Sequence, residues 1–332
     1  MSVERMMTAK SIVAFHANAN RVTLDTVDCS LCGSPDYSLY DSVDEWRIVR
    51  CDRCGFCFTN PRPSVESLPY FYDLGYFRDD EVTRFGWVDE ERDPHGARSN
   101  DYHQRIADIE SRLDNRGRLL ELGAATGEFL SVMRARGWKV DGVELSRDAV
   151  EAARRNREIN LFCGSLEQFE TRESYDVVCM YHSLEHTPNP AFVIARSYEL
   201  LNPDGIIVIE VPNLKGFDAR INRGRRLLSY DLPRHLSHFT PAILAKQLEK
   251  NSFEILDVDS YYPNFILRLV ETLAAPKGTG DRKTISESGN GSSSQSGIEP
   301  PMARSGANWK TRLLKRTSEL FPGWRFTIVA RK

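Results

Sequence analysis

Four cysteines near the N-terminus form two C-x-x-C pairs, CSLC (29–32) and CDRC (51–54), with 18 residues between them. Each pair makes a tight knuckle that aims two thiolates at one ion, and two knuckles complete the tetrahedron of sulfur ligands that zinc prefers. A glycine follows each knuckle, where the turn favours a positive φ angle. The sequence therefore predicts a structural Zn²⁺ site, because four thiolates leave no open position for a substrate. The expected ligands are Cys29, Cys32, Cys51 and Cys54.

Three further cysteines lie outside these pairs. Cys57 fits a small core residue, and Cys163 and Cys179 lie on predicted strands, where we expect them to be buried. The chain opens without a sustained apolar run, so no signal peptide is indicated. We therefore expect a cytoplasmic protein, in which cysteines stay reduced and serve uses other than disulfides.

A glycine-containing bend follows a short apolar run in LLELGAATGEFL. Its pattern is E-x-G-x-x-x-G, which differs from the G-x-G-x-x-G of dinucleotide-binding proteins. Glycines let a ligand approach the backbone closely, and the helix that starts near Gly127 offers unpaired N–H groups to a carboxylate. Glu144 ends the next predicted strand, 21 positions after Gly123, where doubly wound folds bind the hydroxyls of a ribose.

The segment HSLEH (182–186) has the H-x-x-E-H spacing with which one class of zinc proteases holds its metal on a helix. Pro188 and Pro190 leave little room for such a helix, which disfavours a protease. The segment directly follows a predicted strand, so its side chains are expected in the ligand crevice of a doubly wound sheet. A histidine there can remove a proton near neutral pH. The alternative is that His186 only caps the following loop.

A second histidine segment, HLSHF (235–239), follows the strand 204–213. His235 and His238 either contact a substrate or are turn residues that pack around Phe239. A metal site built from His182, His186, His235 and His238 is a further alternative.

Alternating strands and helices must position these residues. Apolar runs predict strands at 118–122, 138–145, 161–164, 174–182, 204–213, 253–260 and 325–331. Helical periodicity predicts helices at 97–113, 127–137, 146–158, 190–201 and 240–251. Ser146 and Thr240 are suitable N-caps. This order predicts an α/β fold with a Rossmann-like, doubly wound, mostly parallel sheet of seven strands and a small N-terminal zinc-binding module.

Several segments together resemble the class I S-adenosylmethionine-dependent methyltransferases. They are ELGAATGEFL, VDGVELS, GSLEQF, YDVVCMYHSLEH, LNPDGIIVIEVPN and HLSHFT, and the resemblance covers about residues 97–260. The front segment, CSLCG…RCDRCGFCFTNPRPS, resembles the N-terminal module of bacterial methyltransferases of sugar and polysaccharide pathways.

The resemblance implies a role for each candidate residue. The backbone of Gly123, Ala124 and Gly127 would hold the methionine end of S-adenosyl-L-methionine, with Glu121 near its amino group. Glu144 would bind the ribose, beside Leu145, and Ser165 and Leu166 would flank the adenine, although many relatives have Asp in place of Ser165. Tyr181 and His182 would line the pocket. The implied catalytic residues are His186 as the base, Glu185 as the residue that orients it, and His182.

The resemblance also implies methylation of a small-molecule or glycan-linked acceptor. A sugar is the preferred acceptor, and both C- and O-methylation remain open. One alternative is O-methylation of a lipid or quinone-like metabolite. Another is a non-catalytic scaffold protein that combines the zinc module with a degenerate methyltransferase domain.

Domain boundaries follow from these motifs. We expect an N-terminal arm (1–27), a four-cysteine zinc module (28–62), a helical connector (63–117), a cofactor-binding domain (118–276 and 309–332) and a Gly/Ser-rich flexible insertion (277–308).

The charge distribution bears on partners. The net charge is −3, and residues 28–62 hold six acids against four bases, so nucleic acid is not an expected partner. Residues 302–332 hold eight bases against one acid. A basic helix expected near 309–320 either packs on the sheet or contacts a membrane surface.

Overall fold

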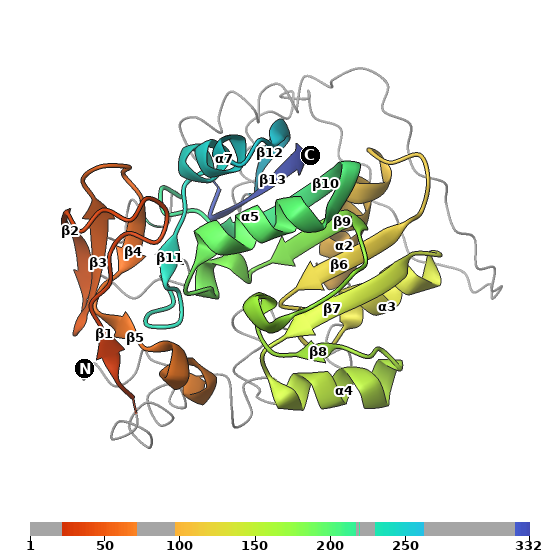
Figure 1. The fold of residues 1–332 in the computed structure, drawn as a ribbon, viewed down its shortest axis with the longest axis horizontal. Coiled ribbons are helices and arrows are strands. Elements are labelled where there is room, and N and C mark those ends of the chain that lie inside the picture. Colours follow the sequence, from red (N-terminus) through yellow and green to blue (C-terminus); the bar gives the residue numbers. More distant parts are fainter. Residues whose placement is uncertain (1–21, 72–96, 217–218, 220–229, 262–322) are drawn as a thin grey trace, which may run out of the picture.

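A computed structural model describes residues 22–71, 97–216, 219, 230–261 and 323–332 of the 332-residue chain. The expected flexible insertion (277–308) and the expected basic helix (309–320) lie outside the described residues. Within the described ranges, strands and helices alternate as the apolar periodicity predicts (Figure 1).

A seven-stranded sheet forms the larger part of the fold, in the order β12-β13-β10-β9-β6-β7-β8. The two pairs that include β13 are antiparallel, and every other pair of this sheet is parallel. The predicted Rossmann-like, mostly parallel sheet is confirmed. Its strands are β6 (Arg118–Leu122), β7 (Lys139–Glu144), β8 (Phe162–Cys163), β9 (Tyr175–Tyr181), β10 (Leu201–Pro212), β12 (Glu254–Tyr261) and β13 (Arg325–Arg331).

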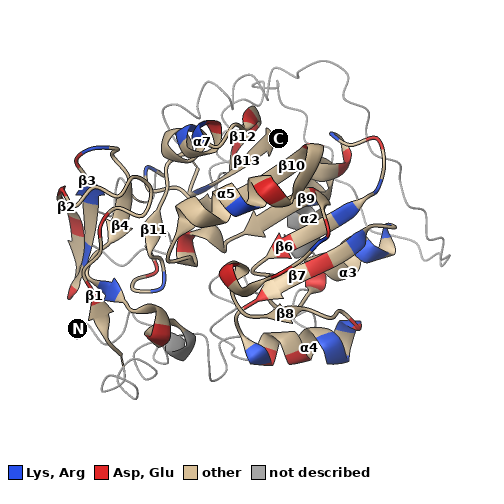
Figure 2. Cartoon of the chain, viewed as in Figure 1, with Lys and Arg blue, Asp and Glu red and all other residues tan. Residues whose placement is uncertain are grey.

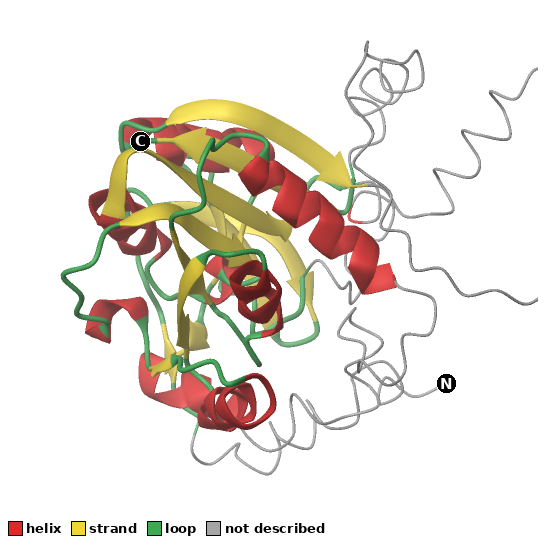
Figure 3. Cartoon of the chain, turned by 90° about the vertical axis from the view of Figure 1, so that its right-hand side faces the viewer, coloured by secondary structure: helices red, strands yellow, loops and turns green. Residues whose placement is uncertain are grey.

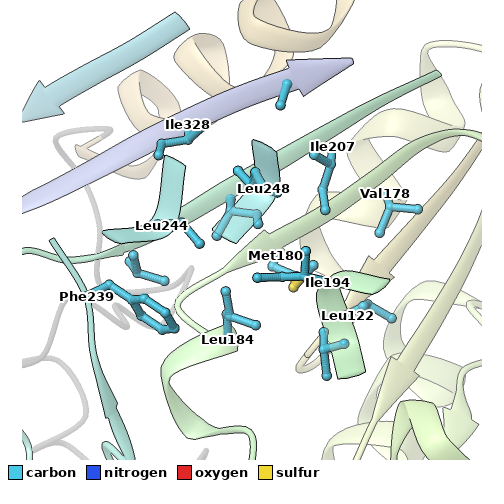
Figure 4. Packing of buried hydrophobic residues seen from close by; sticks show 14 of the residues in the cluster. Leu122, Val178, Met180, Leu184, Ile194, Ile207, Phe239, Leu244, Leu248 and Ile328 are labelled. Atoms are coloured by element: carbon cyan, nitrogen blue, oxygen red, sulfur yellow. The ribbon is translucent and has the colours of Figure 1, made fainter. Parts of the chain in front are cut away.

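Helices cover both faces of this sheet (Figure 3). One face packs against α2 (Ala97–Glu110), α3 (Glu128–Ala135) and α4 (Arg147–Arg157), and the other against α5 (Pro190–Leu200) and α7 (Pro241–Lys250). The alternation of side chains along β9 shows this directly, because Val177 packs in the cluster of α3, whereas Met180 packs with Ile194 of α5 and Leu248 of α7. Figure 4 shows the second of these clusters.

Side-chain caps fix where two of the helices begin, as the sequence predicts. The Ser146 hydroxyl accepts a hydrogen bond from the Ala149 N–H at 3.3 Å, at the start of α4. The Thr240 hydroxyl accepts one from the Ile243 N–H at 3.4 Å, and Pro241 occupies the first turn of α7. Both caps satisfy N–H groups that have no partner within their helix.

A separate four-stranded antiparallel sheet lies at the N-terminal side, in the order β11-β4-β3-β2. Its strands are β2 (Tyr37–Val43), β3 (Trp46–Cys51), β4 (Cys57–Thr59) and β11 (Ser237–His238). A short pair of strands, β1 (Leu24–Asp25) and β5 (Arg62–Pro63), and the 3-10 helix η2 (Val65–Phe71) complete this region. The segment HLSHF, considered above as a turn, thus supplies an edge strand to the cysteine module.

The module and the large sheet share one hydrophobic core. Cys51 and Phe56 of the module belong to the same buried cluster as Phe239 and Leu244. The rings of Phe56 and Phe239 lie 5.3 Å apart between centroids. Docking of the module therefore removes apolar surface from water on both sides of the contact.

Of the cysteines outside the two pairs, Cys57 and Cys179 are buried, as predicted. The expectation was wrong for Cys163, which is exposed. Cys163 ends β8, a two-residue strand at the edge of the sheet, so only one neighbouring strand covers it.

No helix among the described residues is long and apolar enough to cross a bilayer. Figure 2 shows Lys and Arg interspersed with Asp and Glu over the described elements, whereas a phosphate-binding face would gather bases.

Candidate functional site

The glycine bend lies between the end of β6 and the start of α3. Gly123 and Gly127 have φ angles of +78° and +73°, and Ala125 between them has +48°. A Cβ atom on Gly123 would clash with the Cβ of Ser183, so this position requires glycine for space as well as for conformation. The N–H groups of Gly123 and Ala124 both donate to the Val143 carbonyl, at 2.8 and 3.1 Å, which fixes the bend against β7.

Glu144, at the end of β7, faces this bend. Its carboxylate accepts hydrogen bonds from the N–H of Ala125 and the N–H of Ser146, both at 2.8 Å. The side chain is 8% exposed, and burial raises its pKa although the backbone hydrogen bonds oppose the shift. Each carboxylate oxygen can accept a second hydrogen bond, so Glu144 retains the capacity to bind two hydroxyls.

Glu121, on β6 itself, is the second carboxylate at the bend. It is 5% exposed, and its Oε2 atom has no hydrogen-bond partner among the described residues. Burial raises its pKa to about 8, an increase that the charge of Arg105 opposes and the charges of Glu144 and Glu128 reinforce. A bound cationic group would favour the ionised form of this carboxylate.

Arg105 of α2 completes this side of the site, and sequence reasoning missed it. Its guanidinium lies 4.1 Å from the centre of the Tyr181 ring and donates to Glu210 Oε1 at 2.8 Å. Arg105 Nε and the Tyr181 hydroxyl are buried without a hydrogen-bond partner in the described part of the chain. A single arginine on an amphipathic helix gives no sequence signal that distinguishes it from a surface residue.

Glu210 of β10 was missed as well. It is buried and also contacts Arg325 Nη1 at 3.3 Å and the Thr327 hydroxyl at 3.2 Å. Burial raises its pKa, but Arg105, His182 and Arg325 outweigh this and hold the pKa well below its usual range. An acid inside the apolar run IIVIEVP was the available signal, because a charge in a central strand is rarely buried without partners.

The predicted adenine-side residues lie on the elements next to Glu144. Leu145 follows it directly and is 41% exposed. The N–H of Gly164 donates to the Glu144 carbonyl at 2.9 Å, which places Ser165 and the buried Leu166 beside the end of β7. Their contact with an adenine ring stays a prediction.

The HSLEH segment forms a turn and the 3-10 helix η6 (Leu184–His186) after β9. His182 has a left-handed backbone with φ of +54°, and its N–H donates to the Glu210 carbonyl at 2.9 Å. The Ser183 hydroxyl donates to the Leu122 carbonyl at 2.6 Å. The H-x-x-E-H proteases require both histidines on one helix. In this chain His182 lies before η6 and His186 at its end, so the requirement is not met.

The His182 ring lies between two carboxylates. Its Nδ1 atom is 3.5 Å from Glu185 Oε1, and its Nε2 atom is 3.2 Å from Glu210 Oε1. The ring stacks on Trp324 with an interplanar angle of 8°. Burial lowers the pKa of His182, but the nearby carboxylates of Glu185 and Glu210 outweigh this effect, so the pKa is raised. His182 is therefore better suited to hold a proton than to remove one.

His186 meets the second histidine segment. Its Nδ1 atom lies 3.0 Å from the Arg234 carbonyl oxygen, and since a carbonyl only accepts, we assign the hydrogen to Nδ1. The rings of His186 and His235 lie 4.7 Å apart. Burial, with the neighbouring His235 charge, lowers the pKa of His186 to about 4, so it is neutral near pH 7. Its role as a general base stays a prediction.

The two histidines of HLSHF have different places. His235 is buried beside His186 and Glu185, whereas His238 contacts the Thr59 hydroxyl through Nε2 at 3.1 Å. The structure thus brings one of them to the crevice and uses the other to join β11 to the cysteine module.

The four predicted zinc ligands come together. Their Sγ atoms lie within 4.8 Å of one another, with the closest contacts of 3.5 Å between Cys29 and Cys54 and between Cys32 and Cys51. The glycines after the knuckles, Gly33 and Gly55, have the expected positive φ angles of +69° and +78°. A set of four thiolates in this arrangement fits a tetrahedral zinc ion.

Comparison with known proteins identifies the class of protein to which this fold belongs. Residues 94–258 match the model of a family described as "Methyltransferase domain". The chain therefore contains a methyltransferase domain of this family.

Two curated relatives are each less than 30% identical to this chain. The chain is similar to a ubiquinone biosynthesis O-methyltransferase of Rhodopseudomonas palustris, 26% identical over 151 residues, which are 42% of this chain and 59% of that protein. It is similar to a protein of the same name from Neisseria meningitidis, 29% identical over 169 residues, which are 46% of this chain and 71% of that protein. The chain thus spans about three fifths of the first of these relatives.

Two solved structures are also similar to this chain. A SAM-dependent methyltransferase from Archaeoglobus fulgidus is 19% identical, with a TM-score of 0.48, and the match covers 76% of this chain and 100% of that one. A possible histamine N-methyltransferase from Thermotoga maritima is 18% identical, with a TM-score of 0.46, and the match covers 77% and 97%.

Proposed function

We propose that the protein transfers a methyl group from S-adenosyl-L-methionine to a hydroxyl of a small-molecule acceptor. The observation that carries this proposal is the contact between the glycine bend and Glu144, with the buried Glu121 beside it. These features lie together at the ends of β6 and β7, and their chemistry is complementary to the two ends of the cofactor.

The residues of the crevice fit S-adenosyl-L-methionine. Glu121 Oε2, Arg105 Nε and the Tyr181 hydroxyl are buried polar atoms that have no hydrogen-bond partner among the described residues, and such atoms cost free energy unless a ligand satisfies them. A carboxylate and a guanidinium suit the amino and carboxylate groups of a methionine. Glu144 suits the hydroxyls of a ribose.

The acceptor side is formed by the residues after β9 and before β11. When bound, the cofactor supplies a methyl group on a positively charged sulfur. The chain must then align an acceptor oxygen with this methyl group and allow the oxygen to lose its proton. His182, Glu185, His186 and His235 are the titratable groups that the structure brings to this place.

The proposal also includes the chemical class of the acceptor molecule. The curated relatives named above are O-methyltransferases of ubiquinone biosynthesis, which supports a hydroxyl on a quinone-like metabolite. A sugar hydroxyl, which the resemblance of the cysteine module favours, has the same reacting group. Methylation of an extract and mass spectrometry of the product distinguish the two.

We also propose that the four-cysteine site holds a structural Zn²⁺. The convergence of the thiolates supports this, as does the core that the module shares with the large sheet. A closed site of four thiolates stabilises the fold and takes no part in the reaction.

Calorimetry with S-adenosyl-L-methionine tests the proposal. The zinc-loaded wild-type protein should bind the cofactor, and Glu144→Ala should weaken binding at least about 10-fold, because two buried N–H groups and the ribose hydroxyls lose their acceptor. Glu151→Gln, on the exposed face of α4, should bind as the wild type does. Absence of binding by the folded wild-type protein would favour the scaffold alternative.

A further inference from the structure

Three potential metal ligands from two separate segments meet on the acceptor side of the crevice. Glu185, His186 and His235 each offer one ligand atom, and these atoms lie within 4.8 Å of one another. Glu185 and His186 belong to η6, whereas His235 lies in the connection between β10 and β11.

The spacing is close to that of a ligand set. Imidazole nitrogen and carboxylate oxygen bind divalent transition metals at about 2.0–2.2 Å, so two ligands of one ion are separated by roughly 3–4 Å. The observed separations, all within 4.8 Å, are thus somewhat longer than those of ligands around a bound ion.

Glu185 provides a second, independent observation. It is 1% exposed, and neither of its carboxylate oxygens has a hydrogen-bond partner in the described part of the chain. His182 Nδ1 lies 3.5 Å and His235 Nε2 lies 3.9 Å from Oε1. A buried carboxylate with such weak compensation is costly, and a bound cation would remove this cost.

Hydrogen bonds fix the backbone of two of these residues and the ring of the third. The Leu236 N–H donates to the Glu185 carbonyl at 2.9 Å. His186 Nδ1 donates to the Arg234 carbonyl, which leaves Nε2 as the ring atom with the lone pair. The Thr59 hydroxyl donates to the His235 carbonyl at 2.7 Å. The hydrogen bond from the His186 ring to a carbonyl is of the kind that orients histidine ligands in known metal sites.

We propose that Glu185, His186 and His235 bind one divalent first-row metal ion, such as Mn²⁺, Co²⁺ or Zn²⁺, at a site distinct from the four cysteines. Two imidazoles and one carboxylate suit this group of metals and leave coordination positions for other ligands. Asp231 supplies a further negative charge nearby, with Oδ2 at 3.8 Å from His235 Nε2.

The role of this ion rests on the proposed function. An acceptor hydroxyl bound to the ion loses its proton to water more readily, because the cation stabilises the resulting oxyanion. The oxyanion then forms a bond to the methyl carbon, the electron pair of the carbon–sulfur bond stays on sulfur, and neutral S-adenosylhomocysteine leaves. Acceptors with two adjacent oxygens suit the site best, since both oxygens can reach one ion.

Titration with Mn²⁺ tests the site in the full chain after the thiolate site has been loaded with one equivalent of zinc per chain, so that no zinc is left for the mixed site. Manganese avoids thiolates, so it reports on the mixed site alone. Electron paramagnetic resonance of free Mn²⁺ should show one saturable site per chain, and pulsed spectra of bound Mn²⁺ should show coupling to imidazole nitrogen.

Variants locate the site. Glu185→Gln and His235→Gln should each raise the dissociation constant for Mn²⁺ at least about 10-fold, with zinc content and thermal unfolding as checks of folding. The matched controls, Glu151→Gln and His103→Gln, change exposed residues and should leave Mn²⁺ binding unchanged.

Three results would overturn the proposal. They are a folded wild-type protein without a saturable Mn²⁺ site, bound Mn²⁺ without imidazole coupling, and unchanged binding in either ligand variant. The titration contains no S-adenosyl-L-methionine and no acceptor. The metal site and the proposed function can therefore fail separately.

Discussion

The proposed cofactor side and the proposed acceptor side of the site are built in different ways. The main part of the cofactor side is one bend and the end of a neighbouring strand, with hydrogen bonds from backbone N–H groups, to which α2 adds Arg105. The acceptor side consists of side chains from η6 and from the connection before β11, which are about 50 residues apart in the chain. A local sequence pattern can specify the first kind of site, whereas the second exists only after the chain has folded.

The cysteine module is expected to support the acceptor side more than the cofactor side. Cys51→Ser removes one of the proposed zinc ligands, and a structural zinc site contributes on the order of 10 kcal/mol to folding. Because β4 pairs with β11, the loss should reach His235 first. Hydrogen exchange followed by mass spectrometry should show faster exchange at 231–239 than at 119–127. Uniform exchange over both segments would contradict this coupling.

Gly123→Ala should weaken cofactor binding without a matching loss of folding. The new Cβ would meet the Ser183 side chain, and the positive φ angle adds roughly 1–2 kcal/mol of strain. We expect cofactor affinity to fall on the order of 100-fold, measured by calorimetry. Gly33→Ala also has a positive φ angle but meets no atom within 4 Å, so it should leave cofactor affinity unchanged. Equal losses in both variants would show that the effect is general destabilisation.

Glu121, on the proposed cofactor side, should make the free energy of unfolding depend on pH. Its folded pKa of about 8 lies above the ordinary carboxyl value of 4.5, so its contribution to stability is present below pH 4.5 and is lost as the pH rises through 8. Glu121→Gln should remove this fall in the free energy of unfolding, measured by urea denaturation of the cofactor-free protein. A positively charged ligand should bind more tightly as the pH rises through 8. A wild-type stability that is flat from pH 5 to pH 8 would be inconsistent with the buried carboxylate.

Thr59→Val should have the smallest effect, and it should appear on the acceptor side. The variant loses the hydrogen bond to the His235 carbonyl, which contributes about 1 kcal/mol. We expect turnover to fall about 5-fold while the dissociation constant for S-adenosyl-L-methionine stays the same. Ser67→Ala, which removes a hydroxyl that contacts Thr23 and Ser64 instead, is the matched control and should change neither quantity.

The sequence predicts the large sheet well because most of its strands are continuous apolar runs and its helices are periodic, two of them with side-chain caps. The run RLLEL and the cap Ser146 are local signals that no tertiary contact overrides. β11 could not be predicted, because two residues acquire strand geometry only by pairing with β4. Arg105 and Glu210 were missed for a related reason, since their charges identify a buried site only when the folded chain brings them together.

The pairing of β11 with β4 and the shared hydrophobic core join the N-terminal region to the rest of the chain. A truncated protein that starts after residue 71 would expose the row of unpaired peptide groups on β11 and the apolar ring of Phe239. Open strand edges of this kind recruit other chains. A shortened version, cut to the family-matched segment for convenience, is thus expected to aggregate rather than to behave as a smaller enzyme.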